Sequence, residues 1–419
     1  MLYQRFLLLS TFAICSSSYA QSEPDLQQQI NNLKQQLAAL ETKLHQQQAK
    51  VSDEKIETTH TEAKKSKVEV GEAVRANLGI NSYEKGNKDR HGDFDFDMIA
   101  LKFNGNVDDI LLGAELRFYD YMTTVKYAWL GYEFLPNWEV KAGITPVRFG
   151  NQPYNSHSYY FSPNYYIGLE DDFDLGILVS RQMKDNWRLD LGFYKNDELG
   201  GVDGYVDDRS KRYSYDVVGV RTKGEDIYAE PTQKIGEYNT LAGRVGYQFD
   251  IGGVISEIGT SALYGGLHDN QNRVGNYHAW AVHLNSNYQR WNFQLQHSQY
   301  DYNVNNNADR MIVGAYGFYD SIAAQAKSLS ANIAYTLPVS LGPISQLQFY
   351  NDYGMIYDKS DNSRDTIMNT TGVAVSAGNF FSYIDFVNAK NQPFIGGSVA
   401  GDSSKTEQRF NIGLTHCYL

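Results

Sequence analysis

One stretch of the chain, residues 137–175, constrains the fold more than any other. From 138 to 145, apolar residues alternate strictly with polar or small ones, the apolar members being Trp138, Val140, Ala142 and Ile144. A period of two is typical of a strand with one apolar face and one polar face. A long connection, 146–172, follows with six tyrosine or phenylalanine residues between 154 and 166, and alternation then resumes. Two such strands around a long aromatic loop are typical of a transmembrane barrel whose loop folds into its own mouth.

The same alternation continues from about residue 68 to the C-terminus, for example in 110–118 and 187–193. Short turns alternate with longer connections, which fall at about 82–92, 146–172 and 196–236. Short turns on one side and long loops on the other are the layout of an outer-membrane barrel. About 350 residues at roughly 22 per strand and connection predict an all-β, antiparallel transmembrane barrel of about sixteen strands in 68–419, with fourteen or eighteen as alternatives.

The first 20 residues are predicted to be a secretory signal peptide. Arg5 gives a positive start, an apolar run follows from Phe6 to Ile14, and small residues precede the cleavage point at Ala20. This apolar run is too short to cross a bilayer as a helix. Its removal would leave Cys417 as the one remaining cysteine, so we expect no internal disulfide.

Residues 21–50 are predicted to form an α-helical coiled-coil segment. Its apolar residues are spaced alternately by four and three positions, and they are Leu26, Ile30, Leu33, Leu37, Leu40 and Leu44. This is a heptad seam, and so polar a helix with one narrow apolar stripe requires partner copies. The alternative is a glutamine-rich disordered spacer. Residues 51–67 are charged and lack a seam, which predicts a linker.

Composition argues against one class of partner and is compatible with a membrane protein. The formal net charge of −12 argues against binding to nucleic acid. The mean hydropathy is −0.48, and a hydropathy scan would describe such a chain as soluble. Alternating barrel strands give only a weak hydropathy signal, so this value does not exclude a membrane barrel.

The predicted functional residues are the charged side chains that strand parity places toward the water column. Arg148 is added from the long connection. The complete predicted pore lining is Arg75, Glu115, Arg117, Glu139, Lys141, Arg148, Asp174, Arg188, Asp190, Arg244, Asp352 and Arg409. Opposed charges would orient polar solutes, and near-equal signs predict a weak ion preference. The alternative is that any polar lumen carries mixed charges of this kind.

No set of residues indicates catalysis, a metal or a cofactor. Ser156, His157 and Asp171 share one loop, but nothing in the sequence fixes their geometry, so we expect no enzyme. The histidines of the later strands are too scattered to predict a metal site. The tyrosines between 154 and 166 offer stacking faces to sugars or other planar solutes, or else they only pack the loop.

Several segments resemble a known family. They are 127–130 (YAWL), 141–150 (KAGITPVRFG), 371–373 (TGV) and 391–393 (NQP), and 413–418 (GLTHCY) resembles the terminal strand by which barrels are recognised for membrane assembly. On these motifs the chain resembles Gram-negative outer-membrane porins, in particular the phosphate-selective porin O and P family and related trimeric porins with an N-terminal periplasmic coiled coil. The resemblance implies a sixteen-stranded barrel in outer-membrane lipid, a homotrimer with one pore per chain, and a coiled coil in the periplasm. Phosphate specialists carry rows of arginine and lysine, and no dense basic row is seen here.

The predicted function is therefore that of a porin. It would form a water-filled channel for passive diffusion of small polar or charged solutes or ions, constricted by the inward-folded loop 146–172. The alternative is a structural barrel whose coiled coil spaces or anchors the envelope.

Overall fold

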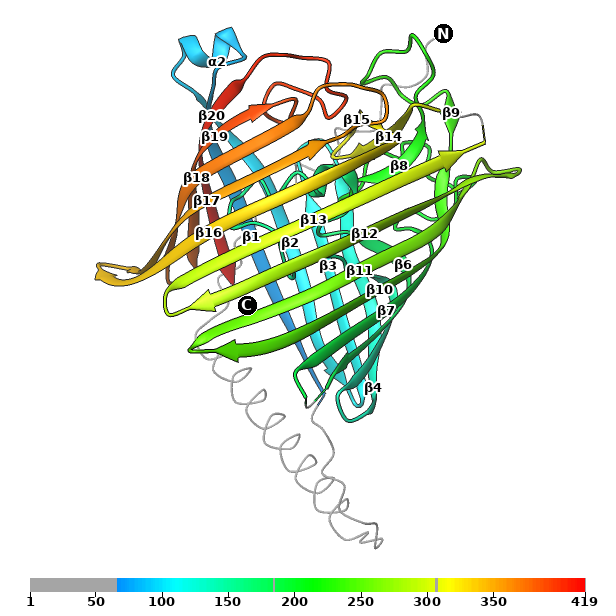
Figure 1. Ribbon diagram of the computed structural model, residues 1–419. Coiled ribbons are helices and arrows are strands. Elements are labelled where there is room, and N and C mark those ends of the chain that lie inside the picture. Colours follow the sequence, from blue (N-terminus) through cyan, green and yellow to red (C-terminus); the bar gives the residue numbers. More distant parts are fainter. Residues whose placement is uncertain (1–65, 184, 306–307, 419) are drawn as a thin grey trace, which may run out of the picture. The chain divides into compact units, whose positions relative to one another are not determined.

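The computed structural model describes residues 66–183, 185–305 and 308–418, which belong to one compact unit, Lys64–Leu419. The predicted signal peptide, the predicted coiled-coil seam and nearly all of the predicted linker lie outside the described residues. The described part forms a closed antiparallel barrel of sixteen strands (Figure 1). The prediction of an antiparallel barrel of about sixteen strands is confirmed.

The barrel strands follow one another around the wall, and the last of them pairs with the first to close it. In order around the barrel they are β1 (Lys67–Asn81), β2 (Asp93–Val107), β3 (Ile110–Phe118), β4 (Thr123–Leu135), β5 (Trp138–Pro146), β6 (Phe173–Gln182), β7 (Trp187–Asp197), β10 (Gly236–Ile251), β11 (Val254–His268), β12 (Arg273–Tyr288), β13 (Trp291–Val304), β16 (Gln325–Leu341), β17 (Ile344–Tyr357), β18 (Thr366–Ala377), β19 (Phe380–Lys390) and β20 (Glu407–Tyr418).

The connections differ between the two ends of the barrel. At one end neighbouring strands are joined by tight turns, such as Gly252–Gly253 between β10 and β11. Both glycines have positive φ, 63° and 85°, as a two-residue hairpin turn of the mirror-image type requires. At the other end are longer connections, including 147–172 between β5 and β6 and 198–235 between β7 and β10. This confirms the layout that the sequence predicts.

Side chains alternate between the two faces of the wall as expected. Leu191 on β7 is 48% exposed, whereas its neighbour Asp190 is 1% exposed. On β10, Leu241 is 61% exposed and Arg244 is 1% exposed. The side chains on the outer face are apolar and those turned inward are polar, which is the arrangement of a barrel with an apolar surrounding and a wet interior.

Two β-bulges place further charged residues inside, against simple parity. Where β1 pairs with β2, the register shifts beside Arg75, and Asp97 is the extra residue on β2. Where β3 pairs with β4, the register shifts beside Glu115, and Lys126 is the extra residue on β4. Arg75 Nε donates a hydrogen bond to Asp97 Oδ2, and Lys126 is buried.

Besides the barrel wall, the chain forms a second, smaller sheet of four strands, which we call the inner sheet. It has the order β15-β14-β8-β9 (Figure 1). Most of its residues are buried, but those of β9 are not. Its strands come from the connections β7–β10 and β13–β16, and they are β8 (Asp216–Val220), β9 (Gln233–Lys234), β14 (Arg310–Ala315) and β15 (Phe318–Ala323). The sequence predicts only a long connection at 196–236, so the inner sheet is a feature that the alternating pattern does not reveal.

Helical structure among the described residues is limited to α2 (Lys85–Asp89) and one 3-10 turn, η1 (Tyr165–Ile167). Neither of these two helices has the length or the apolar character that crossing a membrane requires.

Candidate functional site

The connection 147–172, here called the inner loop, leaves β5 and runs across to distant strands. The Gly150 N–H donates to Ser261 Oγ on β11 at 3.0 Å, and the Asn151 N–H donates to Gln296 Oε1 on β13 at 2.8 Å. These partners are more than 100 residues away in the sequence. The loop is therefore held by the inward-facing side chains of strands that are not neighbours of β5 in the barrel.

The middle of the inner loop reaches two further parts of the wall. The His157 N–H donates to Asp352 Oδ2 on β17 at 2.7 Å. Two residues later, Tyr159 OH donates to Asp97 Oδ2 on β2 at 2.6 Å. A segment that contacts β2, β11, β13 and β17 of one closed barrel can do so only from within it. The inner loop therefore lies inside the barrel.

A buried carboxylate organises the inner loop from its own residues. Glu170 accepts the Asn155 N–H at 2.8 Å and the Ser162 N–H at 3.0 Å, and it also accepts the Ser162 hydroxyl. Burial raises the pKa of the Glu170 carboxyl to about 7, against the lowering effect of these hydrogen bonds. Phe161 and Tyr165 stack with their ring centroids 4.4 Å apart. The inner loop is thus packed by its own hydrogen bonds and ring contacts.

A cavity of about 340 Å³ remains beside the inner loop, and we call it the tyrosine cavity. Barrel strands β1, β2, β3 and β20 form one side of it, and the inner loop forms another. Tyr316 from the inner sheet and Phe394 from the β19–β20 connection also border it. Its aromatic members are Phe96, Tyr119, Tyr121, Tyr159, Tyr160, Phe161, Tyr165, Tyr166, Tyr316 and Phe394.

Three arginines border the tyrosine cavity, and two of them are already neutralised. Arg75 pairs with Asp97, and Arg117 Nε lies 2.6 Å from Glu115 Oε1. Arg409 has no ion pair among the residues that the structure describes. Its nearest partners are neutral, namely the Tyr83 hydroxyl at 3.4 Å and the Phe394 carbonyl at 3.5 Å. Arg409 is therefore the member of this basic group whose charge is least compensated.

A second cavity, of about 250 Å³, lies toward the short turns. Its lining is strongly polar and includes Gln152 at the start of the inner loop, Arg188 on β7 and Glu257 on β11. The two larger cavities thus border different parts of the inner loop, since Gln152 borders one and Tyr159 to Tyr166 border the other.

The structure brings some of the predicted pore-lining residues to these cavities. Arg75, Arg117 and Arg409 border the tyrosine cavity, and Glu115 lies beside it as the partner of Arg117. Arg188 borders the second cavity.

Another group forms an inward-facing ion-pair set that begins with Arg188 at the second cavity. Arg188 Nε lies 3.3 Å from Asp190 Oδ2, and Arg244 Nη1 lies 3.9 Å from the same oxygen. Arg148 at the base of the loop donates to Gln152 Oε1 at 2.7 Å and borders neither cavity.

The remaining predicted residues have other surroundings. Lys141 Nζ lies 2.7 Å from Glu139 Oε1 and 4.3 Å from the Trp129 ring centroid. Asp352 holds the inner loop, and Asp174 belongs to a buried acidic group described below. A role in lining a pore stays a prediction for all twelve residues.

Several residues of the site escaped the sequence pattern. Asp97 and Lys126 are bulge residues, so strand parity misplaces them. Lys126 Nζ lies 2.7 Å from Asp171 Oδ2. His157 instead pairs with Asp352, so Asp171 and His157 have different partners. Glu170 carries no signal in the sequence because its partners are set by the fold of the loop.

No family model and no curated protein sequence matches this chain. Solved structures do match its fold. The outer membrane channel DcaP of Acinetobacter baumannii aligns with a TM-score of 0.54 and 12% identity over 86% of this chain and 99% of that chain. OprB of Pseudomonas putida aligns with a TM-score of 0.53 and 7% identity over 84% and 94%, and an anion-selective porin from Comamonas acidovorans with 0.51 and 11% over 84% and 100%. The chain shares the barrel fold of these proteins.

Proposed function

We propose that this protein is an outer-membrane porin, a channel for passive diffusion of small polar or charged solutes. The observation that carries the proposal is the inner loop, which lies within a closed barrel and leaves a cavity of about 340 Å³ beside it. The apolar outer face of the wall, with Leu191 and Leu241 about half exposed, supports a surrounding of lipid.

The inner loop would form the narrow part of this channel. Its contacts to β11, β13 and β17 fill that side of the interior, and Asn164, Tyr165 and Tyr166 are each at most 2% exposed. A solute would then pass between the loop and the wall formed by β1, β2, β3 and β20, where the tyrosine cavity lies.

The chemistry of the tyrosine cavity supports a preference among solutes. Tyrosine rings offer flat apolar faces with hydroxyl groups at their edges, which suit planar polar solutes. Arg409, which lacks an ion pair among the described residues, would add a mild preference for anions. The proposal does not extend to phosphate selectivity, because Arg75 and Arg117 are paired with carboxylates and do not form an uncompensated row.

The assembly proposed is a homotrimer in the outer membrane, with the N-terminal coiled coil in the periplasm. This rests on the heptad seam of 21–50 in the sequence. The mass of the purified mature chain in mild detergent tests it, and a monodisperse monomer would contradict it.

Planar-bilayer recording tests the proposed function. Purified wild-type protein should produce discrete, ohmic conductance steps, and protein unfolded by boiling should produce none. A folded barrel that inserts but gives no steps would contradict a diffusion channel and favour the structural alternative.

A further inference from the structure

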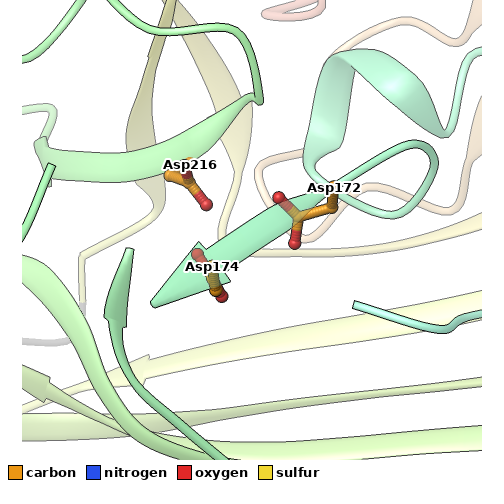
Figure 2. A group of neighbouring side chains, drawn as sticks. All are labelled: Asp172, Asp174 and Asp216. Atoms are coloured by element: carbon orange, nitrogen blue, oxygen red, sulfur yellow. The ribbon is translucent and has the colours of Figure 1, made fainter. Parts of the chain in front are cut away.

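Three carboxylates meet where the inner loop ends beside the inner sheet. Asp172 is the last residue of the loop, Asp174 lies on β6, and Asp216 is the first residue of β8. Figure 2 shows the three side chains grouped together, and one oxygen from each lies within 4.8 Å of the others. The residues are 8%, 4% and 4% exposed, respectively. Two segments, 172–174 and the start of β8, thus bring negative charge to one buried place.

The protein supplies too little positive charge to compensate this group. Arg212 Nη1 lies 2.6 Å from Asp216 Oδ2, but Arg212 also pairs with Asp197 at 2.9 Å and with Glu198 at 3.2 Å. Among the described residues, no cationic side chain pairs with Asp172 or Asp174. Because an ionised carboxylate buried without a counter-charge is strongly unfavourable, either protons or a cation must neutralise the group.

The surroundings of Asp174 indicate a bound ligand rather than a hydrogen-bond network within the protein. Its Oδ1 is buried and accepts no hydrogen bond from any described residue. Asp174 also borders a cavity of about 10 Å³, together with Asp172, Asp216 and Glu237. A space of roughly 10–15 Å³ holds one water-sized sphere. The cavity therefore fits a single ion and is far too small for a solute.

We propose that this cavity binds one calcium ion through Asp172, Asp174 and Asp216. Calcium takes six to eight oxygen ligands in flexible geometry and binds carboxylates directly. Glu237 brings a fourth carboxylate to the cavity, and its Oε1 accepts the Tyr302 hydroxyl at 3.0 Å. Magnesium usually keeps several waters and requires near-ideal octahedral geometry, for which this small cavity leaves no room.

The ion would join the end of the inner loop and the start of β6 to β8 of the inner sheet, which is distant from them in the sequence. It would fix the end of the inner loop to β6 of the wall and to β8 of the inner sheet. This goes beyond the proposed channel function, since the site would hold the interior of the barrel in place whether or not solutes pass.

The test uses full-length protein in detergent, stripped of divalent ions with a chelator and then titrated with calcium chloride in a calorimeter. We expect one bound calcium ion per chain that requires Asp174. The Asp174→Asn variant, which keeps the size of the side chain, should bind roughly tenfold or more weakly, since calcium affinity depends on the number of charged ligands. Glu133→Gln, which neutralises an exposed carboxylate on β4, should bind as wild type does.

Hydrogen exchange at constant pH gives a second readout. Calcium should slow exchange of the β8 amides in wild type and not in Asp174→Asn. If Asp174→Asn does not fold, Asp216→Asn takes its place in both measurements. Absence of calcium binding, equal binding by wild type and Asp174→Asn, or binding of magnesium chloride in place of calcium would each overturn the proposal. The first result would leave the carboxylates neutralised by protons, and none of these results depends on channel conductance.

Discussion

Asp352 on β17 holds His157 of the inner loop through two separate contacts. The His157 N–H donates to Oδ2 at 2.7 Å, and the ring Nδ1 lies 2.8 Å from Oδ1 of the same carboxylate. The ring Nε2 lies 2.7 Å from Asn292 Oδ1 on β13. One loop residue is therefore fixed between two strands of the wall.

The first prediction concerns the pH dependence of this attachment. Burial alone would lower the pKa of His157, but the hydrogen bond and charge of Asp352 outweigh it and raise the pKa above its ordinary 6.5. For Glu170, burial raises the pKa to about 7. A group whose pKa is raised in the folded loop contributes stability that is fully present below its ordinary pKa. This contribution is lost as the pH rises through the raised pKa. Both groups therefore act with the same sign.

We expect the open-channel current to be quieter at about pH 5.5 than at about pH 8.5, because the loop is better anchored when both groups are protonated. His157→Gln keeps a polar side chain that does not titrate, so it should reduce the difference in current noise between the two pH values. Noise that is independent of pH in wild type, or a His157→Gln channel with the full pH dependence, would contradict this role.

The second prediction concerns ion preference. Arg409→Gln should shift the reversal potential in a potassium chloride gradient toward cations, because it removes the least compensated charge of the tyrosine cavity. Two unit charges 4 Å apart interact with an energy of about 4 kcal/mol at an effective dielectric constant of 20 and about 1 kcal/mol in water. The shift should shrink near 1 M salt, where the screening length falls to about 3 Å.

The matched control for Arg409→Gln is Arg290→Gln in the exposed Gln289–Arg290 turn. It removes the same charge outside the cavity and should leave the reversal potential nearly unchanged. Equal shifts in the two variants would show that the preference comes from the overall charge of the protein and not from the tyrosine cavity.

The third prediction concerns the outer face. Leu191→Arg places a charge in the middle of β7 on the apolar face and should cost about 2–4 kcal/mol of folding stability if the residue lies near the bilayer midplane. Gln348→Arg adds the same charge on the inward face of β17 and should cost much less. The measurement is the fraction of heat-resistant folded barrel on unboiled gels, and equal losses would show that the two faces are assigned wrongly.

The period-two pattern predicts the barrel because each strand has one face in an apolar surrounding and one in water. Leu191 and Asp190 illustrate this, since these neighbours are 48% and 1% exposed. The even strand number and the sorting of short turns follow from the same pattern. The hairpin at Gly252–Gly253 is visible in the sequence because only glycine adopts positive φ twice at little cost.

The interior could not be predicted in the same way. Strand β8 is buried at every position, so it has no alternation, and its partner β14 lies about 95 residues further along the chain. The bulge at Lys126 reverses parity locally and cannot be read from the pattern of β4. The path of the inner loop depends on single polar contacts, such as Asn151 with Gln296, which leave no periodic signal.

The most direct test of the account is the conductance of a channel with a shortened inner loop. Removing most of the residues between Gln152 and Tyr165 takes away the contacts to Asp352 and the loop side of the tyrosine cavity. Shortening the β1–β2 connection, which carries α2, is the control, and both variants are first checked for a folded, heat-resistant barrel. We predict that the single-channel conductance in potassium chloride rises for the shortened inner loop and stays at the wild-type value for the control. An unchanged conductance of the channel with the shortened inner loop would contradict the account, because the inner loop would then not set the narrowest part of the pore.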